Sequence, residues 1–169
     1  GFDLPVLHYR ALKHGIAAPR YWDQGEDDRE FKFNNYISRF HSRHTDLMDL
    51  IAGYQARAVQ PLDQIATLLG FPGKMGMSGA KVWDAYLDGD LAGIRNYCET
   101  DVLNTWLVYL RFQLMRGLLD SAALASELTL VRDFLQASGQ PHLLEFLSQW
   151  QAAEAAMPTC DAPLNAPVA

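Results

Sequence analysis

The sequence has few of the features that mark a secreted, a membrane-spanning or a nucleic-acid-coating protein. Its 169 residues contain two cysteines, Cys98 and Cys160. Two are too few for a disulfide framework, and a reducing cytoplasm is the default location. No apolar run approaches the roughly 18–20 residues that a membrane-spanning helix needs, so we expect no membrane partner. The formal charge of −6 argues against electrostatic coating of nucleic acid, but not against an enzyme whose own carboxylates hold metal ions near phosphates.

What is present indicates a mostly helical protein. The chain is 49% hydrophobic and 20% charged, as expected for one globular domain. Apolar residues recur at helical spacing over about residues 3–14, 47–57, 61–69, 82–86, 91–116, 124–135 and 143–150. Only residues 42–47 predict a strand, and residues 31–37 fit an extended piece or a short turn equally well. Residues 17–30 predict an acidic surface loop, and residues from 157 onward predict a loose tail.

Several smaller predictions concern single positions. Asp46 and Asp90 stand where helices begin and are predicted N-caps, as is Ser78 near the end of the glycine-rich stretch at residues 70–79. The stretch 102–110 is apolar nearly all round, which predicts a buried segment. Cys98 lies in the same long helix, and we interpret it as a small apolar filler rather than a nucleophile.

Tyr97 and Asp101 are the residues that most need an explanation. They are four positions apart and therefore share one face of the long helix, a face that is otherwise apolar or small. A carboxylate on such a face must be paired or must bind a metal. A Tyr–Asp hydrogen bond, or an Asp–Arg pair, is one explanation, and a catalytic site is the other. Asp3 has the same two interpretations, as a helix cap or as a site residue.

The order of these residues resembles the DEDD superfamily of 3′–5′ exonucleases. Phe2-Asp3 matches the second acidic motif, and Tyr97-x-x-x-Asp101 matches the third motif of the tyrosine branch. The sister branch carries a histidine where this sequence has Asn96. The opening residues 1–7, the glycine loop with Lys74 and residues 97–103 are similar to bacterial proteins related to the proofreading domain of family B DNA polymerases.

The resemblance implies an α/β ribonuclease H-like fold, of which this chain supplies a mostly helical part. Residues 1–116 would be the C-terminal part of the exonuclease domain, 117–156 a helical extension and 157–169 a loose tail. The implied activity is hydrolysis at single-stranded DNA 3′ ends with two Mg²⁺ or Mn²⁺ ions. It implies Asp3 and Asp101 as metal ligands and Tyr97 as the group that orients water. The implied substrate-binding residues are Phe2, Leu4, Lys74 and Ser78.

One part of the family pattern is missing. The first motif, Asp-x-Glu on the first strand, does not precede Phe2-Asp3 in this sequence. We expect an N-terminally truncated chain, with nuclease activity in the full-length protein and none in this fragment alone. The alternative is a catalytically incomplete ribonuclease H-like module that binds nucleic acid or protein. A patch left exposed by missing strands could drive self-association.

Overall fold

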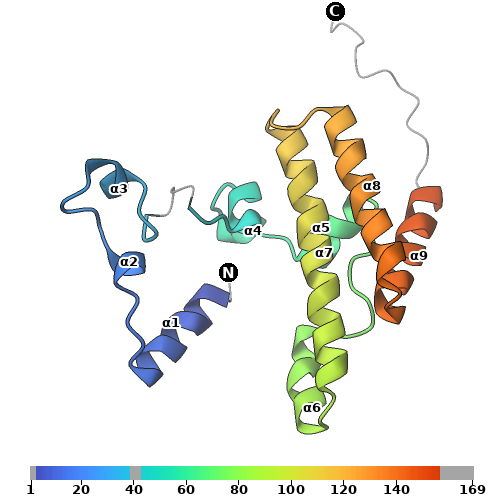
Figure 1. The fold of residues 1–169 in the computed structure, drawn as a ribbon, viewed down its shortest axis with the longest axis horizontal. Coiled ribbons are helices and arrows are strands. Elements are labelled where there is room, and N and C mark those ends of the chain that lie inside the picture. The colour runs from blue at the N-terminus through green and yellow to red at the C-terminus, as the bar shows by residue number, and fades with distance from the viewer. Residues whose placement is uncertain (1–2, 39–42, 157–169) are drawn as a thin grey trace, which may run out of the picture. The chain divides into compact units, whose positions relative to one another are not determined.

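The computed structural model describes residues 3–38 and 43–156. The chain divides into two compact units, Gly1–Gln60 and Pro61–Ala169, and each is described here by itself. Within the described ranges every regular element is a helix and none is a strand (Figure 1). The strand predicted at 42–47 is therefore wrong over residues 43–47. Asp46 instead accepts backbone hydrogen bonds from Met48 and Asp49 at 3.1 and 3.2 Å and begins a helix, which confirms it as an N-cap.

The described residues of the first unit, 3–38 and 43–60, form four short helices and one 3₁₀ turn. They are α1 (Asp3–His14), α2 (Pro19–Trp22), α3 (Arg29–Phe33), α4 (Leu47–Ile51) and η1 (Ala56–Ala58). Helix α1 has the predicted bounds, whereas the predicted surface loop contains α2. Helix α4 ends earlier than predicted because Gly53 and Tyr54 adopt φ values of 60° and 59°, a left-handed conformation that cannot continue an α-helix.

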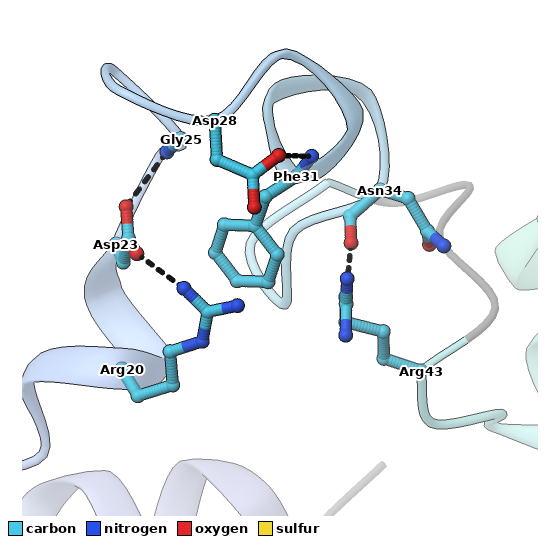
Figure 2. Close-up of polar contacts among 7 residues, drawn as sticks. All are labelled: Arg20, Asp23, Gly25, Asp28, Phe31, Asn34 and Arg43. Atoms are coloured by element: carbon cyan, nitrogen blue, oxygen red, sulfur yellow. Dashed lines mark hydrogen bonds and ion pairs between the residues drawn. The ribbon is translucent and has the colours of Figure 1, made fainter.

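Phe31 forms the centre of the first unit. Its side chain is fully buried, and the guanidinium groups of Arg20 and Arg43 lie 3.8 and 4.4 Å from its ring centroid. Asp23 pairs with Arg20 at 2.8 Å, and the Asp28 carboxylate accepts the Phe31 amide hydrogen at 3.0 Å to cap α3 (Figure 2). Two carboxylates of the acidic segment therefore stabilise the packing around this ring.

The second unit is a helical assembly organised around one long helix. It contains α5 (Leu62–Leu68), η2 (Gly79–Lys81), α6 (Val82–Leu87), α7 (Leu91–Met115), α8 (Ser121–Ser138) and α9 (Pro141–Ala156). Helices α5, α6, α8 and α9 all contact α7 (Figure 1). These helices confirm the apolar periodicities of the sequence. Their shared core contains the fully buried side chains of Leu107, Leu135, Phe146 and Trp150.

Helix ends in this unit follow local chemistry, with one exception. The Asp90 carboxylate accepts the Gly93 amide hydrogen at 2.8 Å, so it caps α7 as predicted. Gly139 ends α8 with φ 64°, the left-handed conformation that glycine adopts most easily. The predicted Ser78 cap is wrong, because its side chain makes no capping hydrogen bond. Its backbone carbonyl accepts from the Lys81 amide at 2.8 Å instead.

The burial predicted for residues 102–110 is only partly correct. Leu107 and Val108 are buried, but Val102 and Trp106 are 67% and 44% exposed. Cys98 is also exposed, so its interpretation as a core filler is wrong. Cys98, Val102 and Trp106 recur every four residues and so lie on one side of α7. The described helices of the second unit leave that side uncovered.

Among the described helices, none combines the length and the apolar character that crossing a membrane requires.

Candidate active site

Tyr97 and Asp101 form a hydrogen-bonded pair on α7. The phenol hydroxyl donates to the Asp101 carboxylate, as their spacing on one helix face allows. Both side chains are half-buried, so the pair lies at the surface of the second unit rather than in its core. The explanation of Tyr97 as the partner of Asp101 is therefore confirmed. It does not exclude a functional role, because a half-buried carboxylate can still reach a ligand.

The surroundings of the pair shift both of its pKa values. Burial, the hydrogen bond to Asp101 and the negative charge of that carboxylate together raise the pKa of Tyr97 to about 12. Burial also raises the pKa of Asp101 above its ordinary value, with the nearby charge of Asp63 acting in the same direction. The Tyr97 hydrogen bond and the Lys74 charge oppose this rise only in part. Tyr97 is consequently a neutral hydrogen-bonding group at pH 7 and not a general base.

The glycine-rich loop between α5 and η2 reaches the pair at two points. The Gly79 amide donates to the Tyr97 hydroxyl oxygen, and the Lys74 ammonium interacts electrostatically with the Asp101 carboxylate. The structure thus brings together three of the residues that the sequence singled out, Lys74, Tyr97 and Asp101. Ser78 directly precedes Gly79 in the same loop and is half-buried.

Asp63 belongs to this group of residues and was missed in the sequence. It lies in the first turn of α5, and its carboxylate accepts the Lys74 amide hydrogen at 2.6 Å. The negative charge of the same carboxylate contributes to the raised pKa of Asp101. In the sequence Asp63 is one polar residue on an amphipathic helix. No local pattern distinguishes it, because its partners lie 11 and more residues away.

The other predicted site residues belong to the first unit. Asp3 begins α1 and Leu4 follows it, whereas Phe2 lies outside the described residues. Lys74, Tyr97 and Asp101 all belong to the second unit. The meeting of Asp3 with Asp101 at one metal centre therefore stays a prediction.

A sequence with the spacing of the first acidic motif does occur later in the chain, at Asp28-Arg29-Glu30. It follows Phe2-Asp3 instead of preceding it, and it lies at the start of α3 rather than on a strand. The Asp28 carboxylate is engaged as the N-cap of that helix (Figure 2). This local role favours a structural interpretation of the segment over a metal-binding one.

The carboxylates around Asp101 supply only part of a metal site. Over residues 3–38 and 43–156, no three His, Cys, Asp or Glu side chains gather as a metal-ligand set. Asp101 offers the hard oxygen ligand that Mg²⁺ and Mn²⁺ prefer. Asp63 already accepts a backbone amide hydrogen, and the charge of Lys74 acts on Asp101. The described residues of the second unit therefore do not complete a two-ion centre by themselves.

Comparison with known proteins decides the class of the molecule. A family described as a predicted 3′–5′ exonuclease related to the exonuclease domain of PolB matches residues 1–150. The chain belongs to this exonuclease family. The match contains Asp3, the glycine-rich loop and the Tyr97–Asp101 pair, and it extends through α8 into α9. No curated protein and no solved structure matches the chain.

Membership of the exonuclease family supports a general class of activity and implies a fold to which the helices belong. It identifies a nuclease-type enzyme with a nucleic-acid substrate. A family related to the PolB exonuclease domain also implies a ribonuclease H-like fold, to which the described helices contribute the α part.

Proposed function

We propose that the protein containing this chain is a cytoplasmic, proofreading-like 3′–5′ exonuclease that hydrolyses phosphodiester bonds at single-stranded DNA ends. The observation that supports this proposal is the Tyr97–Asp101 pair, on which the charge of Lys74 acts, inside the exonuclease family match. The charge and geometry of these three residues suit a site that meets a phosphate while holding a carboxylate in place.

Asp101 is proposed to be a ligand for Mg²⁺ or Mn²⁺, together with Asp3 and further carboxylates. Such ions, when bound, stabilise the charge on the attacking and leaving oxygens of phosphoryl transfer. The contribution of Asp101 is a fixed orientation, because the Tyr97 hydroxyl holds one of its oxygens. The pKa of Asp101 is raised in this structure. A nearby positive charge would lower that pKa and so favour the ionised carboxylate.

Tyr97 is proposed to orient the attacking water. A phenol has one donor hydrogen and two acceptor positions. The hydrogen goes to Asp101, and one acceptor position receives the Gly79 amide hydrogen. The remaining lone pair can accept a hydrogen bond from water and so align it. A pKa of about 12 keeps this arrangement intact at neutral pH.

Lys74 is proposed to contact a phosphate of the substrate. Its backbone is held by Asp63, and its side chain is exposed next to Asp101. An ammonium group in this position suits phosphate recognition, which places a strand without reading its sequence. Ser78 in the same loop and Phe2 and Leu4 in the first unit complete the proposed substrate-binding set.

The experiment uses the complete natural gene product and a single-stranded DNA oligonucleotide labelled at its 5′ end, with Mg²⁺ or Mn²⁺ present. We expect the labelled strand to shorten from its 3′ end, and phosphorothioate linkages at that end to prevent this. Asp101→Asn should abolish the reaction, whereas Asp133→Asn on the exposed surface of α8 is the matched control and should retain it. Full activity in Asp101→Asn would contradict the proposed site. Preference for an RNA oligonucleotide would correct the substrate.

A further inference from the structure

Asn104 fastens the glycine-rich loop to helix α7. Its side-chain amide donates to the Gly73 carbonyl at 2.7 Å, and its side-chain oxygen accepts the Gly73 amide hydrogen at 3.2 Å. The same amide group also donates to the Thr100 carbonyl at 3.2 Å. Asn104 is 1% exposed and Gly73 is buried, so water does not compete for these hydrogen bonds. Breaking them leaves buried polar groups without partners, which is costly.

The loop can approach α5 this closely only because residue 73 is glycine. Its φ is +67°, and a Cβ atom would lie 2.7 Å from the Thr67 hydroxyl and 2.8 Å from an Asp63 carboxylate oxygen. That carboxylate also accepts the Lys74 amide hydrogen at 2.6 Å. Two consecutive loop residues are therefore held by different helices. Asn104 on α7 binds Gly73, and Asp63 on α5 binds Lys74.

The position of Asn104 on α7 links this clamp to the candidate site. It follows Asp101 by three residues, which is about one helical turn. Lys74 comes directly after the clamped Gly73, and its charge acts on Asp101. The side chain must donate to a carbonyl and accept from an amide at once. An amide side chain does both, whereas a carboxylate only accepts and an aliphatic chain does neither.

We propose that Asn104 is a positioning residue that acts through Lys74: by fastening Gly73 to α7 it fixes where the following lysine lies, so that the Lys74 ammonium meets a substrate phosphate. This inference rests on the role given to Lys74 in the proposed function. It adds a residue that touches neither substrate nor metal, and it explains why an amide side chain is buried in the largely apolar core beside α7.

The first test measures the clamp without any substrate. Amide hydrogen exchange is followed by NMR in the full gene product and in its Asn104→Ala and Asn104→Ser variants. We expect the Gly73 and Lys74 amides to exchange at least about tenfold faster, because their partners are lost or loosened. The amide of Leu135 in the core of α8 reports global unfolding and should accelerate by a smaller factor than the Gly73 amide. Gln136→Ala removes an exposed amide side chain and is the matched control. Unchanged Gly73 exchange would overturn the clamp.

The second test measures whether the clamp acts through Lys74. Binding of a phosphorothioate-terminated single strand is measured by fluorescence anisotropy over a range of salt concentrations. Losing one phosphate contact should reduce the slope of log K against log[salt] by about 0.7. We expect this reduction in Lys74→Met and a similar one in Asn104→Ser, with no further change in the double variant. Partial unfolding would lower the fraction of protein that binds without changing this slope. A changed slope therefore indicates a lost phosphate contact and not a loss of folded protein.

Two outcomes would overturn the inference. An unchanged slope in Asn104→Ser means that the clamp does not position Lys74. An unchanged slope in Lys74→Met means that the lysine makes no phosphate contact. In the second case 3′–5′ hydrolysis by the wild-type protein can still be observed, so the failure of this inference is distinct from failure of the proposed function.

Discussion

The phenol hydroxyl of Tyr97 donates to the carboxylate of Asp101 one helical turn away. The hydrogen bond exists only while the phenol is protonated, and the adjacent negative charge disfavours a phenolate. Burial adds to this effect, and the pKa of Tyr97 rises to about 12. The pair therefore couples the ionisation of a tyrosine to the stability of the second unit.

The pH dependence of stability should report this coupling. The folded-state pKa of Tyr97 lies above the unfolded value of about 10, so the folded protein binds the proton more tightly. The stabilisation is complete below pH about 10 and is lost as the pH rises toward 12. We expect Tyr97→Phe to lose less stability than wild type over this interval in denaturant titrations. Equal losses in the two proteins would contradict the prediction, and phenolate absorbance provides an independent check.

Asp101→Asn should separate activity from stability. Mutation of a group that only hydrogen-bonds to a metal ligand typically lowers metal affinity or activity by about 10–100-fold. If Asp101 is itself a ligand, as proposed, its loss should lower activity by more than about 100-fold. The raised pKa of Asp101 means that the folded state disfavours its charge, and stability falls as the pH rises through that pKa. Asparagine removes this charge and still accepts the Tyr97 hydrogen bond. The Tm of the Asp101→Asn variant at pH 7 should therefore equal or exceed that of wild type. A Tm several degrees lower would contradict this explanation.

The helices could be predicted because apolar residues recur at helical spacing within each segment. The spacing of apolar residues located α1, α5, α7, α8 and α9, and short-range capping located Asp46 and Asp90. Local sequence also placed Tyr97 and Asp101 on one face, since this depends only on helix geometry.

The remaining features depend on packing between distant parts of the chain. An apolar stretch in α7 does not reveal which side its neighbours cover, and this is why the exposure of Cys98 and Val102 was missed. Asp63 and Asn104 acquire their roles from loop residues 11 and 31 positions away. The predicted strand failed because a capping interaction at Asp46 competes with extended structure there.

Trp150 should be the most costly aromatic residue to remove from the second unit. It is fully buried, the Phe71 ring meets it edge-on at 5.7 Å, and the Arg132 guanidinium lies 4.3 Å from its ring centroid. Trp150→Ala should lower the free energy of unfolding by about 3–5 kcal/mol. Trp83 is 65% exposed, and Trp83→Ala should change it by less than about 1 kcal/mol. Denaturant titration followed by circular dichroism compares the two, and similar losses would contradict the assigned core.

Gly73 and Gly76 provide a matched pair within one loop. Both have positive φ, +67° and +77°, so alanine at either position incurs a left-handed strain of about 1–2 kcal/mol. Only at Gly73 would the new Cβ meet other atoms, at 2.7 Å from Thr67 and 2.8 Å from Asp63, whereas nothing lies within 4 Å at Gly76. Gly73→Ala should therefore lose more unfolding free energy than Gly76→Ala, and it should also accelerate exchange of the Lys74 amide. The difference between the two variants isolates the close approach of the loop from the strain they share. Equal losses would mean that the Asp63 and Thr67 side chains move aside without cost, and that the loop is held less tightly than its hydrogen bonds indicate.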